Sequence, residues 1–296
     1  MLAVVGTIPD KNFPLVAGEV VVQNDELKVQ GHSFGINRGT PALIAAVCKT
    51  LDFLKNPLPF AYLVGDTGLG DGSRRLYKFL ADHIRTAQFT TMAFHYLQPD
   101  VDWCNRIMFA IEEIASRPVL IADAGSMYMA KMSGNAPLFD LFTPDAGELA
   151  FLADEDAPHP FYTRGFILHE ENLAPDLIKR AYTHENASRY ILVKGEQDYI
   201  ADKDGIIAVV DSPNEPALEP IGGTGDALTG IVSALIESGM ETSKAAVIAA
   251  RVNILAGNYT MPTPATQISD IIENIPRALD FVLNSAERFD TVKNIE

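Results

Sequence analysis

The sequence predicts an α/β protein with a mostly parallel central sheet, and two patterns along the chain favour this class. Strand-like apolar runs alternate with helix-like runs from about residue 60 to residue 193, with short connections. Such alternation is typical of βαβ units, whose strands lie parallel. The last third of the chain is nearly all helical by the spacing of its apolar residues. At 296 residues the chain can bury a full core, and we expect residues 1–296 to form a single domain.

The first elements are predicted to be strands. Residues 1–8 form an apolar run without the basic segment of a secretory signal, so they are expected to be a first strand. Residues 18–22 and 27–30 flank the polar turn Gln23-Asn24-Asp25-Glu26 and indicate a β-hairpin over about residues 16–31. A helix is expected over residues 41–54.

Strands and helices then alternate. Strands are predicted over residues 60–64, 88–96, 119–122 and 138–142, and helices over residues 74–84, 101–115 and 146–152. Thr143 or Asp145 is expected to cap the last of these helices. Residues 153–171 are rich in Pro, Asp and His and are expected to form a long loop that serves as a lid or an interface.

The C-terminal part begins with a helix over residues 173–184 and a strand over residues 190–193 that ends at Lys194-Gly195. A second hairpin is predicted from residues 199–201 and 206–210, around Asp202-Lys203-Asp204-Gly205. The helical part, about residues 226–285, is expected to contain helices over residues 228–238, 243–258 and 268–283, the first ended by Gly239.

The charge balance excludes some classes of partner. The net charge is −16, from 39 acidic and 23 basic residues, so a nucleic-acid backbone would be repelled. No apolar run reaches the length of a membrane span, and Cys48 and Cys104 both lie in apolar helical patterns typical of buried thiols. We therefore expect a cytoplasmic protein that binds a small molecule, with no nucleic-acid or membrane partner. A homo-oligomer stays open.

The segment from Pro220 to Gly230 is the strongest functional signal. Gly222, Gly223 and Gly225, with Thr224 between them, allow successive backbone N–H groups to converge on a phosphate at the start of a helix. Asp226 would be repelled by that phosphate, so a proton taken from a substrate hydroxyl, or a bound metal, better explains its place. A helix N-cap is the alternative.

Further polar residues follow predicted strands. Asp123, Asp145 and Lys194 are expected to meet the glycine turn in one crevice, because ligands of open α/β sheets gather at the carboxyl ends of the strands. Asp123 would hold Mg²⁺ through water or bond neighbouring N–H groups; Lys194 would bind phosphate or lie at an exposed strand end. Asn37 and Arg38 would position substrate or form a surface turn.

The histidines, by contrast, carry no metal signal. His95, His159, His169 and His184 lack a regular metal-ligand spacing, which predicts no structural metal.

Several segments together resemble the ribokinase-like NAD(P)H-hydrate dehydratases. Residues 143–149 (TPDAGEL) are similar to the family's T-P-H-x-G-E-hydrophobic signature. The family's order K-G, I-A-D-x-D-G, N-x-x-L and G-G-[ST]-G-D is similar to Lys194-Gly195, residues 200–205, residues 214–218 and residues 222–226. Residues 268–279 are similar to its last helix, so the resemblance covers about residues 119–280.

The resemblance implies a three-layer α/β/α sandwich that dehydrates hydrated NADH or NADPH using ADP or ATP with Mg²⁺, by phosphorylating the hydroxyl and then eliminating phosphate. It implies that Asp226 is the base, and that Gly223 and Gly225 donate N–H groups to the transferred phosphoryl group. It also places Lys194 and Gly195 along the nucleotide and Asp145, where the family usually has His, on the substrate side.

The chain departs from the family pattern in places. Glu196 and Asp198 follow Lys194-Gly195, where the family has a small residue and Thr near the phosphates, which predicts either a changed phosphoryl acceptor or a loss of nucleotide use. Residues 94–99 (FHYLQP) replace the G-P-G-L-G turn, and residues 35–40 replace a G-G-S stretch. Residues 64–70 resemble the V-G-D-x-x-G of sugar kinases in the same superfamily. Phosphorylation of another alcohol, such as a sugar or vitamin, and a non-catalytic binding role therefore stay as alternatives.

Overall fold

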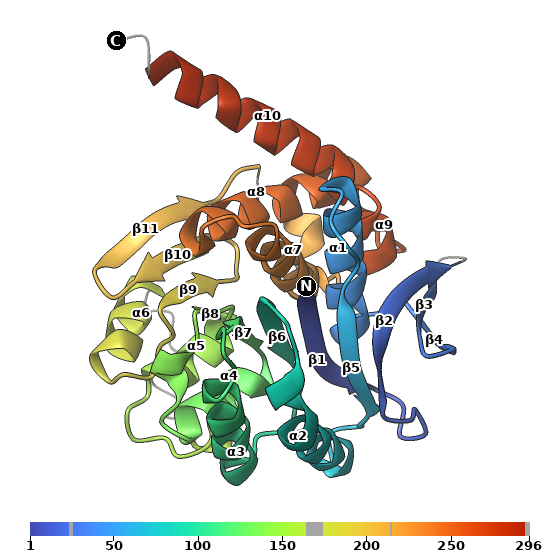
Figure 1. Ribbon diagram of the computed structural model, residues 1–296. Helices are drawn as coiled ribbons and strands as arrows, with labels where there is room; N and C mark the ends of the chain where they lie inside the picture. Colours follow the sequence, from blue (N-terminus) through green and yellow to red (C-terminus); the bar gives the residue numbers. More distant parts are fainter. Residues whose placement is uncertain (24–25, 164–173, 214, 294–296) are drawn as a thin grey trace.

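The computed structural model describes residues 1–23, 26–163, 174–213 and 215–293, with side chains to residue 284. Its strands form one sheet in the order β11-β10-β9-β8-β7-β6-β1-β5-β2-β3-β4 (Figure 1). Their bounds are β1 Leu2–Ile8, β2 Val16–Gln23, β3 Glu26–Val29, β4 His32–Gly35, β5 Phe60–Gly65, β6 Thr91–His95, β7 Val119–Asp123, β8 Leu141–Phe142, β9 Tyr190–Val193, β10 Asp198–Asp202 and β11 Gly205–Val210. The six strands from β9 to β5 are parallel, and antiparallel strands extend both edges.

Helices cover both faces of this sheet. Their bounds are α1 Thr40–Phe53, α2 Asp71–His83, α3 Val101–Glu112, α4 Gly125–Met132, α5 Ala146–Ala153, α6 Ala174–Thr183, α7 Thr224–Glu237, α8 Thr242–Thr260, α9 Ile268–Ile272 and α10 Ile275–Lys293. Figure 1 shows α1, α7 and α8 on one face and α2, α3 and α4 on the other. None of the helices, over the described residues, has the length and apolarity needed to cross a membrane.

Strand β1 explains why the sheet is covered twice. All seven of its residues are buried, and successive side chains of a strand point to opposite faces. Leu2 and Val4 pack in the core shared by α1, α7 and α8, whereas Ala3 and Val5 pack in the core shared by α2 and α3. A continuous apolar run of this kind is typical of a strand buried on both faces, so the three-layer arrangement follows from the sequence.

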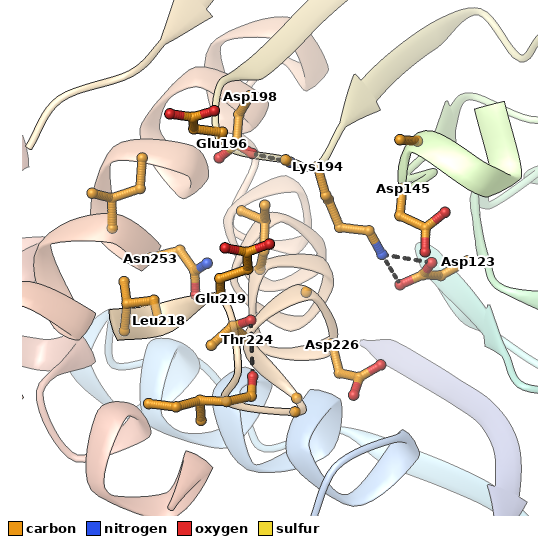
Figure 2. Close-up of a pocket in the computed structure, with 18 of the residues that line it drawn as sticks. Asp123, Asp145, Lys194, Glu196, Asp198, Leu218, Glu219, Thr224, Asp226 and Asn253 are labelled. Carbon is orange, nitrogen blue, oxygen red and sulfur yellow. Dashed lines mark hydrogen bonds and ion pairs between the residues drawn. The ribbon is translucent and has the colours of Figure 1, made fainter. Parts of the chain in front are cut away.

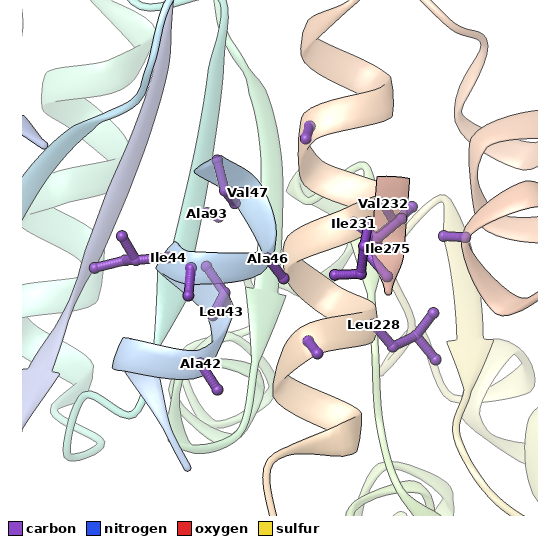
Figure 3. Close-up of a cluster of buried hydrophobic side chains, with 14 of the residues drawn as sticks. Ala42, Leu43, Ile44, Ala46, Val47, Ala93, Leu228, Ile231, Val232 and Ile275 are labelled. Carbon is purple, nitrogen blue, oxygen red and sulfur yellow. The ribbon is translucent and has the colours of Figure 1, made fainter. Parts of the chain in front are cut away.

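The close packing of α1 against α7 positions the functional residues (Figure 3). A Cβ on Gly230 of α7 would lie 2.4 Å from the carbonyl oxygen of Leu43 in α1 and 2.9 Å from Cβ of Ala46. Only glycine allows this approach. One helical turn earlier, the same register places Asp226 beside Gly39, the residue that precedes α1.

Most of the expected elements are present. The strands and helices of the βαβ part lie at their predicted places, and the hairpins β2–β3 and β10–β11 are antiparallel as expected. The N-terminal hairpin gains a third strand, β4, which the sequence analysis missed together with α4. The expected loop over residues 153–171 and the motif residue Asn214 lie partly or wholly outside the described residues.

Two expected elements are wrong in extent. The helix expected over residues 268–283 is two helices, α9 and α10, because Pro276 lacks the N–H that a continuous helix would need. The strand expected over residues 138–142 is reduced to Leu141–Phe142. Residues 136–138 instead form a 3-10 turn, whose second residue is Pro137.

Candidate active site

A cavity of about 750 Å³ lies at the carboxyl ends of the parallel strands (Figure 2). Its lining contains Asp123 after β7, Asp145 before α5, Lys194 after β9 and the glycine turn before α7. These residues were expected to meet in one crevice, and the structure brings them together. Among the described residues that line it, Lys194 is the one basic side chain.

The glycine turn leaves the start of α7 open toward the cavity. Gly223 precedes the helix with φ +108°, and no described side chain caps it. A Cβ on Gly223 would lie 2.9 Å from Cγ1 of Ile268, and one on Gly225 would lie 3.3 Å from Cδ of Lys194. Since the first N–H groups of a helix have no intrahelical partner, this turn offers donors to an anion. Asp226, the third residue of α7, is therefore not its N-cap.

Asp226 is held by two residues from the N-terminal half. Its Oδ2 accepts the Gly39 N–H at 2.6 Å, and its Oδ1 lies 3.1 Å from Nε2 of His95. The side chain is 12% exposed. Burial raises the pKa of Asp226, but the hydrogen bond and charge of His95, the charge of Lys194 and the Gly39 N–H outweigh burial and hold the pKa below its usual range. Asp226 is thus an ionised carboxylate at the edge of the cavity.

Lys194 lies beside Asp226 and is fixed by Asp123. Its Nζ lies 2.8 and 2.9 Å from the two carboxylate oxygens of Asp123. Thr229 donates to Asp123 Oδ2 at 2.6 Å, and the Ala124 N–H donates to Oδ1 at 2.8 Å. Burial lowers the pKa of Lys194, but the charges of Asp123 and Glu148 raise it more, so the ammonium stays charged.

Of the two residues expected to cap α5, Thr143 and Asp145, the N-cap is Asp145. Asp145 Oδ1 accepts the Glu148 N–H at 2.8 Å, and Glu148 Oε2 accepts the Asp145 N–H at 2.8 Å, which completes a capping box. Burial, with the nearby charges of Asp123 and Asp145, raises the pKa of Glu148 although Lys194 opposes this. Both side chains line the cavity beside Lys194.

The two carboxylates that the sequence analysis placed near the nucleotide differ in environment. Asp198 is buried, and its Oδ1 accepts the Gly195 N–H at 3.1 Å. Burial raises the pKa of Asp198 to about 7, although the Gly195 N–H and Lys194 lower it in part. Glu196 is exposed at the rim of the cavity. Neither side chain lies against the glycine turn in Figure 2.

Other predicted residues lie apart from the cavity lining. Asn37 and Arg38 are exposed and do not line it, although the Arg38 side chain packs against Gly222, where a Cβ would lie 3.2 Å from its Cδ. In the sugar-kinase-like segment, Asp66 accepts the backbone N–H groups of Gly68, Leu69, Gly70 and Ser73. The Asp66 carboxylate therefore stabilises the loop over residues 66–73 through these hydrogen bonds.

Three lining or adjacent residues were missed by the sequence analysis. His95 contacts Asp226, Tyr96 lines the cavity with φ +54°, and Asn253 of α8 has a buried Oδ1 without a hydrogen-bond partner among the described residues. His95 and Tyr96 occupy the place of the family's glycine turn, so the departure itself was their signal. The sequence contained no comparable signal for Asn253.

One group of side chains has the composition of a metal site. Ligand atoms of His95, Asp123 and Asp226 lie within 4.8 Å of one another. The group does not fit Mg²⁺, which prefers oxygen ligands, because one ligand is a nitrogen and the Asp123 oxygens already accept from Lys194 and Thr229. Asp123 as a magnesium residue stays a prediction.

Comparison with known proteins points to one family. A family model described as NAD(P)H-hydrate dehydratase matches residues 99–277. An uncharacterized protein of Methanocaldococcus jannaschii is 41% identical over 242 residues, which cover 81% of this chain and all of that protein. The bifunctional NAD(P)H-hydrate repair enzyme Nnr of Pyrobaculum aerophilum is 31% identical over 168 residues, 56% of this chain and 30% of that enzyme.

Solved structures share the fold. The ADP/ATP-dependent NAD(P)H-hydrate dehydratase from Bacillus subtilis, co-crystallized with ATP/Mg²⁺, matches with a TM-score of 0.54 and 16% identity, over 95% of this chain and 89% of that one. A ribokinase-like superfamily protein from Enterococcus faecalis matches with a TM-score of 0.56 and 14% identity, over 95% and 87%. The ribokinase-like fold expected from the sequence is confirmed.

Proposed function

The chain belongs to the NAD(P)H-hydrate dehydratase family, and we propose that it removes water from hydrated NADH or NADPH at the expense of ADP or ATP, with Mg²⁺. The proposed reaction phosphorylates the hydroxyl of the hydrate and then eliminates phosphate. A relative named as an ADP-dependent (S)-NAD(P)H-hydrate dehydratase, a relative named as a bifunctional NAD(P)H-hydrate repair enzyme and a neighbour crystallised with ATP/Mg²⁺ support the proposal. We also propose that residues 1–296 act as one domain in the cytoplasm, where NADH and NADPH are used.

The position of the Asp226 carboxylate in the first turn of α7, held by Gly39 and His95, is the observation on which this proposal rests. The carboxylate lies within one turn of the open N–H groups of the glycine turn and 12% of it is exposed. We propose that Asp226 accepts the proton of the substrate hydroxyl while the N–H groups of Gly223 and Gly225 stabilise the transferred phosphoryl group. Base and anion site thus belong to the same helix terminus.

The two ends of the cavity suit two different ligands. Asp145 and Asp226 lie on one side of the cavity in Figure 2, which we propose as the substrate end. On the opposite side, Leu218 lies near Asn253, whose Oδ1 has no hydrogen-bond partner among the described residues, and Ile221 and Ile254 add apolar surface to the cavity lining. An apolar slot with one hydrogen-bond acceptor suits a nucleobase that carries an amino group. Lys194 and Gly195 lie between the two ends, where the phosphates would lie.

Acidic side chains outnumber basic ones in the cavity lining, which favours the binding of a cation such as Mg²⁺. Eight carboxylate side chains line the cavity: Asp123, Asp145, Glu148, Glu196, Asp198, Glu215, Glu219 and Asp226. Asp145 and Glu148 each keep one oxygen that accepts no hydrogen bond from the described residues, so this pair fits a hard cation. We propose that Asp145 and Glu148 hold Mg²⁺, which would neutralise phosphate charge next to Lys194.

The substitution Asp226→Asn tests the proposed function. The assay follows the return of absorbance at 340 nm from hydrated NADH or NADPH with Mg²⁺ and ADP or ATP. We expect the wild type to turn over and Asp226→Asn to lose at least about 10²-fold in kcat, as expected for a lost general base. Asp82→Asn, at an exposed position outside the cavity, is the matched control. Lack of nucleotide-dependent turnover in the wild type would contradict the proposal.

A further inference from the structure

We propose that His95 is a positioning residue that orients the carboxylate of Asp226 toward the cavity. His95 ends β6, is completely buried, and precedes the segment that matches the family model. Its Nε2 lies 3.1 Å from Asp226 Oδ1. The inference rests on the proposed role of Asp226 as base, and it concerns a contact that this chain makes where the family has a glycine turn.

The partners of the two ring nitrogens of His95, Thr40 and Asp226, together indicate that Nε2 carries a proton. Thr40 Oγ1 lies 3.0 Å from Nδ1 of His95. A carboxylate only accepts, so Nε2 must carry a proton that it donates to Asp226, while the Thr40 hydroxyl can donate to or accept from Nδ1. The opposite tautomer would place the lone pair of Nε2 against a carboxylate. The geometry therefore assigns Nε2–H as the donor to Asp226.

The surrounding backbone makes this chain of contacts possible. A Cβ on Gly6 of β1 would lie 2.6 Å from Cγ2 and 2.7 Å from Oγ1 of Thr40, so only glycine leaves room for the Thr40 side chain. The preceding residue, Gly39, has φ +87° and donates its N–H to Asp226 Oδ2 at 2.6 Å. Each oxygen of Asp226 is therefore fixed by the segment Gly39–Thr40, one directly and one through His95.

The two contacts leave a carboxylate with a single orientation. Asp123 Oδ2 lies 3.7 Å from Nε2 of His95, too far for a good hydrogen bond, so the ring donates to Asp226 and not to Asp123. A base held in its productive orientation loses no free energy to reorientation when the substrate arrives. A histidine that served only the core would need no bond to a group that lines the cavity.

Variants of His95 separate positioning from packing. His95→Gln keeps an amide N–H that can reach Asp226, whereas His95→Leu keeps the volume and removes the donor. We expect His95→Leu to lower kcat by 10- to 100-fold with the KM for nucleotide changed less than about 2-fold, and His95→Gln to recover to within about 5-fold of the wild type. Thr40→Val, which removes the hydroxyl without changing shape, is expected to lower kcat by 3- to 10-fold.

Crystal structures of the same variants keep this test independent of the substrate. We expect the Asp226 carboxylate to turn or become disordered in His95→Leu and to keep its place in His95→Gln. An unchanged Asp226 in a folded His95→Leu protein, or kcat within 3-fold of the wild type, would overturn the inference. If the wild type has no turnover, the proposed function fails, and the orientation of Asp226 still decides the role of His95.

Discussion

The Gly39 N–H donates to Oδ2 of Asp226 at 2.6 Å, and this contact between residues 187 apart in the chain joins the starts of α1 and α7. This contact depends on how closely α1 and α7 pack one turn further on, where Gly230 lies against the carbonyl oxygen of Leu43. The distance between Asp226 and its hydrogen-bond donor Gly39 therefore depends on Gly230, which does not line the cavity.

Gly230→Ala should push α1 and α7 apart. Its Cβ would lie 2.4 Å from the Leu43 oxygen, a backbone atom that cannot turn away. We expect a loss of about 2 kcal/mol in the free energy of unfolding, as for other overpacked cores, and a lower kcat because Gly39 withdraws from Asp226. Urea unfolding and kinetics measure the two effects. Ser233→Ala, also buried in α7, is the control that should leave kcat unchanged.

The ion pair between Lys194 and Asp123 predicts a non-additive pair of substitutions. Asp123 is completely buried, so Lys194→Met would leave its charge without a cation and should cost about 3 kcal/mol in stability. The double variant Lys194→Met/Asp123→Asn should regain most of that loss, since no charge is then left buried. In the single and the double variant, nucleotide should raise the melting temperature less than it does in the wild type, because both lack the Lys194 ammonium. Additive losses would argue against the pair.

The raised pKa of Asp198 predicts a pH-dependent stability. The folded protein holds this carboxyl with a pKa of about 7, against an ordinary value of 3.8, so the folded protein binds more protons than the unfolded chain between these pH values. Stability is therefore lost as the pH rises through this window.

Asp198→Asn should remove that loss while keeping an acceptor for the Gly195 N–H. Its advantage in the free energy of unfolding should grow by roughly 1–2 kcal/mol between pH 5.5 and 8.5, since one pKa unit corresponds to about 1.4 kcal/mol. Urea unfolding at the two pH values is the measurement. The exposed Asp204→Asn is expected to show no such trend, and an equal trend in both variants would contradict the role of Asp198.

Two glycines with similar backbone angles separate strain from crowding. Gly223 has φ +108° and Gly239 has φ +93°, but a Cβ would lie 2.9 Å from Ile268 Cγ1 at Gly223 and meet nothing within 4 Å at Gly239. Gly239→Ala should cost about 1 kcal/mol through backbone strain alone. Gly223→Ala should cost at least about 1 kcal/mol more and weaken the thermal stabilisation by nucleotide, which Gly239→Ala should preserve. Equal effects of both on nucleotide binding would exclude the turn as an anion site.

Local patterns predicted the elements that depend on local interactions. The parallel strands were found because each is an apolar run bounded by turn residues, and Asp145 was found as a cap because capping involves residues three apart. Helix α4 was missed because its eight residues begin with glycine and follow directly after a strand. The break before Pro276 was missed because apolar spacing continues across it.

Residues 222–226 by themselves predicted a glycine-rich turn with one carboxylate at the start of a helix, because the turn and its carboxylate are adjacent in the sequence. That the turn binds an anion stays a prediction. Tertiary structure decided the rest. Contacts with His95, 131 residues away, and Gly39, 187 residues away, hold Asp226, while burial raises the pKa of Asp198. Distances across the fold and exclusion of water determine these properties, and neither is encoded in any local stretch of residues.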